Sequence, residues 1–282
     1  MSSVLFDVPG PRARRRYQIL TAVFALLLLA IVAWVVQRLL AEKVLTADAV
    51  NATFQNRYLE VVIEGFISTL KAAGLAILTS LLAGALLAAG RLSNHAVVRW
   101  PCTAFIEFFR AVPLLLLFFY IFYAYESQIG TLLTVVLALT LYNGSVLAEI
   151  FRAGINAVQK GQSEAAYALG MRKTQVMNLI LMPQAVRFML PAIVSQCVVV
   201  LKDTTLGQLI TYDEVVRQAR GITLAPGAEA LLIYALVALV FILINYSLGK
   251  LAEYLERRLS RRGERAGARL TIEPGMGAGA GA

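Results

Sequence analysis

The stretch QKGQSEAAYALGMRKTQVMNLILMPQAVRFMLP, residues 159–191, is the part of this chain that apolar membrane packing alone does not explain. It is polar, it carries four basic residues, and it lies between two long hydrophobic regions. Ser163 is a good N-cap residue, Glu164 suits the positive end of a helix dipole, and Gly170 is typical of a helix stop. These residues predict a short helix from about Glu164 to Leu169.

One face of this expected helix is apolar. Ala165 and Ala166 lie four and three residues before Leu169, a spacing that places the three side chains on the same side of a helix. They form a small, nearly flat apolar patch on a polar segment, and such a patch can sit in a groove of a partner protein. The alternative interpretation is an ordinary cytosolic loop that forms a turn or two of helix.

The order of residues in this stretch favours the first interpretation. Glu164-Ala165-Ala166 is followed by Gly170, and then by Ile180 and Pro183. This order resembles the EAA loop of bacterial ABC-importer permeases, which runs EAA, three residues, Gly, nine residues, Ile, one residue and Leu-Pro. The Leu of that pattern is Met182 here, a volume-conserving replacement. In that family the loop is the coupling helix that docks into a groove on the ATP-binding subunit.

Further segments resemble the polar amino-acid branch of these permeases, the histidine/glutamine type. The resemblance covers about Phe66 to Leu255 and is carried by Gly65, Thr69-Leu70, Ala73, 90–93, 107–114, Glu149, Arg152, Gly161-Gln162, 183–185 and 202–206. It implies the all-α fold of a type I importer permease with five core spans, here preceded by one more at the N-terminus. That additional span and the basic start of the chain resemble the permeases of actinobacterial glutamate importers.

The composition is that of a chain embedded in a bilayer. Of 282 residues 59% are hydrophobic and 15% are charged, a balance that would leave a soluble domain covered with exposed apolar patches. A net charge of +9 is typical of a protein that binds nucleic acid. In a membrane protein, however, the basic residues mainly indicate which loops are cytoplasmic, so no nucleic-acid partner is expected. Cys102 and Cys197 are interpreted as small core residues, and His95 as a loop residue without a ligand role. No metal site is therefore expected.

Apolar runs long enough to cross the ~30 Å hydrocarbon core predict six membrane-spanning helices. They are expected over residues 17–40, 66–89, 102–125, 130–150, 188–210 and 230–248. Gly84 and Ala88 in the second run allow the backbone of another helix to approach closely. Two polar connections, 41–63 and 211–229, are expected to be extracytoplasmic loops, the second with room for a short helix.

The first run has a competing interpretation. Basic residues within 1–16 precede it, as they precede the core of a cleaved signal peptide. The run exceeds a normal signal core and no clear small-x-small cleavage site follows it, which favours an uncleaved span at 17–40. The permease domain is then expected over 64–256, and the low-complexity tail at 263–282 is expected to be disordered.

The distribution of basic residues predicts the orientation of the chain. Six spans with both termini inside place four basic segments on one side of the membrane: the start at 1–16, the loop at 91–99, the coupling loop at about 159–187 and the stretch after Lys250. No other arrangement gathers the loop-borne Lys and Arg as well. The expected location is therefore the bacterial plasma membrane, with both termini cytoplasmic.

Charged residues within or near the spans are candidates for the translocation path. An ionisable residue there is a functional hypothesis by default. The candidates are Arg110, Glu149, Lys202 and Asp203. The alternative is structural, since these residues can pair with one another or with lipid headgroups. Lys202 and Asp203 are adjacent in an expected helix and do not face each other, so each needs a different partner or water.

The resemblance implies a transport subunit without catalysis of its own. No G-x-x-x-x-G-K-[ST] phosphate loop is present, so ATP and Mg are expected on a separate polypeptide. The implied partners are two copies of an ATP-binding subunit, a second permease that is identical or homologous, an extracytoplasmic substrate-binding protein, and membrane lipid. The residues expected at the ATPase contact are Gly161, Glu164, Ala165, Ala166 and Gly170. A bulky charged replacement at Ala166 is expected to uncouple transport.

Two function classes follow. The first is the permease subunit of an importer of polar amino acids, with glutamate as the most specific expectation. The alternative is a self-sufficient secondary transporter or channel, in which Lys202, Asp203 and Glu149 carry ions. Such transporters commonly show inverted repeats with interrupted helices at matching positions, and no such pairing is seen. A membrane enzyme ranks third, because no cluster of His, Cys or carboxylates has catalytic spacing.

Overall fold

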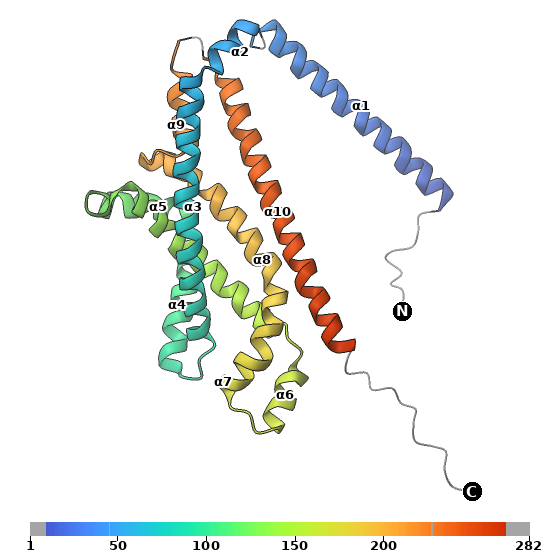
Figure 1. Cartoon of the computed structure of the whole chain (residues 1–282), viewed down its shortest axis with the longest axis vertical. Helices are drawn as coiled ribbons and strands as arrows, with labels where there is room; N and C mark the ends of the chain where they lie inside the picture. Colours follow the sequence, from blue (N-terminus) through green and yellow to red (C-terminus); the bar gives the residue numbers. More distant parts are fainter. Residues whose placement is uncertain (1–9, 45, 227, 269–282) are drawn as a thin grey trace.

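The protein is a bundle of long helices, which confirms the predicted all-α membrane fold. The computed structural model describes residues 10–44, 46–226 and 228–268, and every regular element within them is helical. The elements, labelled in part in Figure 1, are α1 (Pro11–Ala41), α2 (Ala47–Thr53), α3 (Asn56–Arg91), α4 (Ala96–Ala111), α5 (Leu114–Asn156), α6 (Lys160–Ala168), α7 (Lys173–Gln175), the π-helix η2 (Val176–Leu181), α8 (Met182–Asp203), the 3₁₀-helix η3 (Thr204–Ile210), α9 (Val215–Thr223) and α10 (Ala230–Ala268).

Five helical stretches among the described residues are long and apolar enough to cross a membrane. They are Arg12–Ala41, Arg57–Arg91, Leu114–Asn156, Lys173–Ile210 and Ala230–Leu251. Four of them contain a predicted span each. The stretch Leu114–Asn156 holds the fourth predicted span together with part of the third.

The long helix α5 is broken at Gly130, where the fourth span was predicted to begin. Gly130 has φ 76° and ψ 166°, a conformation that is open to glycine and outside the helical region. Arg91 bonds to Glu107 before this break at 2.8 Å and to Glu149 after it at 2.9 Å. A straight helix of this length would carry Glu149 tens of ångströms away. The chain therefore turns back at Gly130, and α5 consists of two arms.

The third predicted span, residues 102–125, is wrong as one continuous helix. The structure interrupts it between α4 and α5, where Val112 has φ −76° and ψ 128°. Steric clash with the ring of Pro113 disfavours the helical conformation of the residue before it. The extended Val112 thus ends α4, and a new helix starts after Pro113.

The boundaries of the polar connection at 41–63 also differ from the prediction. It contains the short helix α2, and α3 begins at Asn56, ten residues before the predicted start of the second span. Val62 is 4% exposed and packs with Phe66 in an apolar cluster that includes residues of α9 and α10. Polar residues on the other face hid this part of the helix from a search for continuous apolar runs.

The segment 211–229 forms the predicted short helix, α9, which packs against α3 and α10. Its Val215, Ala219 and Ile222 are buried in the same apolar cluster. Glu214 caps the helix, because its carboxylate accepts hydrogen bonds from the backbone N–H of Val216 at 2.8 Å and of Arg217 at 2.7 Å. The segment is therefore a packed part of the fold rather than a free loop.

Glu214 should make stability depend on pH. Its side chain is fully buried, and this burial raises the pKa of its carboxyl from an ordinary 4.5 to about 7. The folded chain then keeps a proton that the unfolded chain releases, so the free energy of unfolding should fall as pH rises from 4.5 to 7, by at most about 1.4 kcal/mol per unit. Thermal unfolding in detergent across this range checks the slope. Glu214→Gln should flatten it, and an unchanged slope in that variant would assign it to another group.

The contact between α3 and α5 is the close approach that the small residues predicted. A Cβ added to Gly84 would lie 2.8 Å from Leu147 Cβ and 3.0 Å from the carbonyl oxygen of Gly144. Gly144 in turn faces Ala83, whose Cβ would lie 3.2 Å from a Cβ at that glycine. The missing side chains let the two backbones approach within a distance that larger residues would prevent.

The two ends of the described chain extend beyond the predicted elements. The helix α1 begins at Pro11, so the Arg-rich start is its first turn, and in Figure 1 α1 stands apart from the bundle, with none of its most apolar window buried. At the other end α10 continues to Ala268, past the expected start of disorder at Gly263. Residues 257–268 include five Arg, and Arg favours helix. The rest of the expected tail, 269–282, lies outside the described residues.

Candidate functional site

The coupling stretch forms the helix α6 at the lower end of the molecule in Figure 1, and α6 packs against η2. It begins at Lys160, with Gln159 as N-cap residue. The predicted N-cap role of Ser163 is wrong, because its hydroxyl donates a hydrogen bond at 2.8 Å to the carbonyl of Lys160 inside the helix. The helix thus starts about one turn earlier than predicted and includes Gly161.

The predicted stop at Gly170 is confirmed. This glycine has φ +77°, a left-handed conformation in which side chains are strained. The backbone N–H of Met171 donates to the carbonyl of Ala166 at 3.2 Å, and that of Gly170 donates to Tyr167 at 2.9 Å. This pair of bonds is a Schellman motif, which satisfies carbonyls at the end of the helix.

The predicted apolar patch on α6 is only partly exposed. Ala166 is 4% exposed and is buried in the protein, whereas Ala165 is exposed and Leu169 is 83% exposed. A face with Gly161, Ala165 and Leu169 at four-residue spacing therefore points away from the bundle, together with the exposed Glu164. A bulky charged replacement at Ala166 would therefore also disturb the packing of α6 itself.

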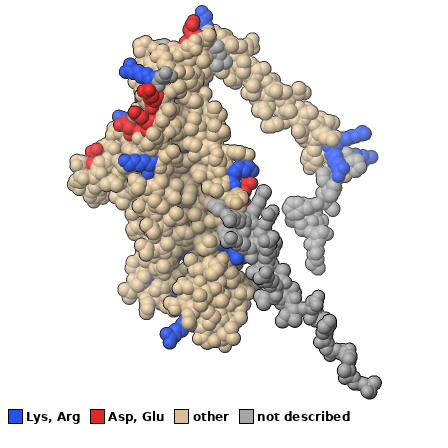
Figure 2. Space-filling view, viewed as in Figure 1, with Lys and Arg blue, Asp and Glu red and all other residues tan. Residues whose placement is uncertain are grey.

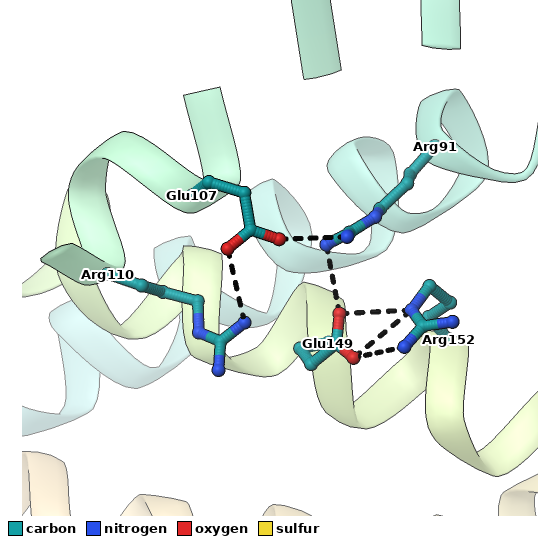
Figure 3. Close-up of polar contacts among 5 residues, drawn as sticks. All are labelled: Arg91, Glu107, Arg110, Glu149 and Arg152. Carbon is teal, nitrogen blue, oxygen red and sulfur yellow. Dashed lines mark hydrogen bonds and ion pairs between the residues drawn. The ribbon is translucent and has the colours of Figure 1, made fainter. Parts of the chain in front are cut away.

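A cluster of five charged side chains joins three helices near the end of α3 (Figure 3). Arg91 from α3 pairs with Glu107 of α4 and with Glu149 of α5. Glu149 also accepts hydrogen bonds from Arg152, whose Nε lies 3.0 Å from its carboxylate. Arg110 completes the cluster at 4.0 Å from Glu107. Two of the four predicted path residues thus take the structural alternative and pair with neighbours.

The other two path residues, Lys202 and Asp203, lie at the end of α8, where the α-helix changes to the 3₁₀-helix η3. Lys202 is exposed and Asp203 is half-buried, and neither side chain forms a hydrogen bond or ion pair with another residue that the structure describes. Unpaired charges in an apolar span need water or a partner. The role of Lys202 and Asp203 in the translocation path remains a proposal.

The sequence interpretation missed some buried polar contacts. Asn143 is fully buried in α5 and accepts a hydrogen bond at 2.6 Å from the side chain of Gln196 in α8. Arg91 was assigned to a basic loop and to the segment 90–93 of the resemblance, and its place at the centre of the charge cluster was not predicted. Asn143 and Gln196 are both polar positions inside predicted spans, but only the fold reveals that they meet.

A bundle of membrane-length helices that projects a short, partly exposed helix between two of its spans has the architecture of a transporter permease. The chain matches the family described as binding-protein-dependent transport system inner membrane component over residues 76–261, and it belongs to this family. The match confirms the family predicted from the EAA-like order of residues. The chain is therefore a transport component.

Similar proteins match most of the chain. It is 44% identical over 206 residues to the glutamate transport system permease protein GluD of Corynebacterium glutamicum, covering 70% of this chain and 74% of that one. It is 36% identical to the probable glutamine ABC transporter permease protein GlnP of Bacillus subtilis, covering 73% and 96%. Its fold is similar to the crystal structure of an amino acid ABC transporter with histidines, with a TM-score of 0.66, 31% identity and coverage of 72% and 95%.

Proposed function

We propose that this chain is the membrane-spanning subunit of an ATP-driven importer of polar amino acids, with glutamate as its substrate. The 44% identity to a permease named for glutamate transport supports the substrate. The implied assembly has two permease subunits, two ATP-binding subunits that hold ATP and Mg, and an extracytoplasmic substrate-binding protein. Lys202 at the end of α8 is the cation of the proposed path whose side chain has no bonding partner among the described residues, which suits a carboxylate substrate.

The observation that carries this proposal is the outward face of α6. Leu169 is 83% exposed beside the exposed Ala165, while the neighbouring Ala166 is buried and α6 as a whole packs against η2. An exposed leucine on a rigid, capped helix costs little to bury in a partner's groove, because the helix is already ordered. This face is the proposed ATPase contact.

The distribution of charge supports a cytoplasmic position for α6. On the face shown in Figure 2, acidic side chains gather toward the end of the molecule that carries α2 and α9. The opposite end carries Arg91, Arg99, Lys160, Arg172 and Lys173 in its helix ends and loops. Basic residues are retained on the cytoplasmic side of membrane proteins. Both termini are therefore proposed to be cytoplasmic.

The packing of α6 explains how a partner's motion could reach the spans. It contacts η2, and η2 continues directly into α8, which packs against α5 and α10. A partner that binds α6 tightly in only one of its ATP states would shift the equilibrium between two arrangements of these helices. Alternating access follows from that shift without chemistry in this chain.

Reconstitution into proteoliposomes tests the function. We expect uptake of radiolabelled glutamate only when the ATP-binding subunit, ATP and the binding protein are all present. Unlabelled glutamate should compete better than unlabelled glutamine, because the proposed substrate carries a second carboxylate. Uptake by this chain alone would instead establish the alternative, a self-sufficient secondary transporter or channel.

A further inference from the structure

A cavity of about 620 Å³ lies beside the coupling helix. It is lined by the end of α3 and the loop after it, by the end of α5, and by the continuous segment α7, η2 and the first half of α8. Its volume falls within the range of about 300–1,000 Å³ that small-ligand sites occupy. Neither the docking face of α6 nor the charge cluster around Arg91 contributes to its walls.

The walls of this cavity are divided into a polar end and an apolar end. The polar residues come from the loop after α3 and from α7 and η2: Ser93, Asn94, His95, Lys173, Thr174 and Asn178. The apolar walls come from the helices, from Ala85 to Ala89 on α3 and from Met182 to Ile193 on α8. The division follows the helix axes, so the polar end faces the surface and the apolar end runs into the membrane region.

The polar end carries positive charge without a balancing carboxylate. No Asp or Glu lines the cavity, and Lys173 forms no ion pair with any residue that the structure describes. Its Nζ donates hydrogen bonds to the carbonyl of Leu92 at 3.1 Å and to the side chain of Asn94. These neutral acceptors hold the ammonium group at the mouth of the cavity and leave its charge available to an anion.

We propose that this cavity binds one anionic phospholipid of the cytoplasmic leaflet, with its phosphate at Lys173 and an acyl chain between α3 and α8. The leaflet follows from the orientation in the proposed function, on which this inference rests. Basic pockets between spans on the cytoplasmic side are suited to anionic headgroups.

The shape and lining of the apolar end favour an acyl chain over a soluble anion. The wall from Met182 to Ile193 is about 16 Å long at the helical rise of 1.5 Å per residue. Three of the six methionines in the chain, Met177, Met182 and Met189, line the cavity. Methionine is flexible and adapts to chains of varied shape. A free amino acid or phosphate would leave most of this surface without contacts.

Lipid counting on the full-length permease tests the proposal. The chain is purified in detergent, stripped of lipid, and titrated with phosphatidylglycerol or with the zwitterionic phosphatidylethanolamine, and bound lipid is measured by native mass spectrometry. We expect one phosphatidylglycerol to bind more tightly than phosphatidylethanolamine. Lys173→Gln should weaken phosphatidylglycerol binding about fivefold, the effect of one basic residue near an anionic lipid. Lys160→Gln, which removes the same charge from α6, should leave binding unchanged.

Cavity-filling variants test the position of the acyl chain. Ala89→Phe from α3 and Val186→Phe from α8 should each abolish binding of both lipids at this site, and thermal unfolding confirms that they are folded. Leu86→Phe, at an exposed position outside the cavity, should bind as the unmodified chain does. Unchanged lipid binding in both filled variants would overturn the proposal. Displacement of the lipid by glycerol phosphate or glutamate would also overturn it and assign the cavity to a soluble anion.

Failure of this inference and failure of the proposed function are distinguishable. Lipid binding is measured without an ATPase, ATP or transport. A chain that binds the lipid but never supports uptake contradicts only the proposed function. A chain that supports ATP-driven uptake but does not bind phosphatidylglycerol contradicts only the proposed lipid site.

Discussion

Replacing Leu169 with Glu should prevent copurification of the ATP-binding subunit and reduce ATP-driven glutamate uptake by about 30-fold or more. Leu169 is 83% exposed on the outward face of α6, so the change leaves the permease core untouched. A buried apolar anchor at an interface contributes about 2 kcal/mol or more, which corresponds to about a 30-fold loss of affinity, and a carboxylate in its place adds a desolvation penalty. Pull-down of the ATPase and uptake in proteoliposomes measure both effects.

Leu224→Glu is the matched control. Leu224 is also 83% exposed, but it follows α9 at the opposite end of the molecule. The same substitution there should leave ATPase binding intact, and immunoblots of membranes should show equal amounts of both variants. Normal ATPase recovery with Leu169→Glu would remove α6 from the coupling interface.

Replacing Gly84 with Leu should prevent α3 and α5 from packing together. Even a single added carbon would lie 2.8 Å from Leu147 Cβ and 3.0 Å from the backbone oxygen of Gly144. A backbone oxygen cannot rotate away as a side chain can, so the two helices must separate. We expect the free energy of unfolding to fall by about 3 kcal/mol or more. This is at or above the upper end of the typical destabilisation caused by adding side-chain atoms to a packed core. The yield of folded protein and its thermal unfolding in detergent measure this loss.

Gly74→Leu is the control for this second prediction, because it makes the same change in the same helix. A Cβ at Gly74 meets no atom within 4 Å. Both substitutions gain about 0.8 kcal/mol of helix propensity, so the difference between them isolates the contact with α5. Equal stability of the two variants would contradict the close packing at Gly84.

Local features of α3, α5 and α6 were predictable because glycine and other small residues occur in helices mainly at breaks, ends and close helix contacts. Glycine at 130 and 170 marked two places where the helix ends or breaks, and both have positive φ. The spacing of Gly84 and Ala88 predicted a close helix contact, and the structure supplies α5 as the partner. Apolar length alone located most of the spans. These signals depend only on neighbouring residues and hence on the sequence itself.

Features that depend on distant partners were not predictable in the same way. Ala166 is buried where α6 packs on the rest of the fold, and helical spacing alone could not distinguish it from the exposed Leu169. The start of α3 at Asn56 is set by contacts with α9, about 150 residues away in the sequence. The role of Arg91 in joining three helices depends on two carboxylates that belong to other helices. In each case the missing information was the identity of the neighbour.

The shared position of Arg91 has a consequence for how the molecule can move. One guanidinium touches carboxylates from two other helices, so the ends of α3, α4 and α5 are tied at a single point. Sliding of α3 past α5 would break the part-buried pair of Arg91 with Glu149, which is costly, and sliding past α4 would break its more exposed pair with Glu107. These three helices are therefore expected to tilt together as one rigid body. The residues that bend during a conformational change are then expected in the segment from α6 through η2 to α8.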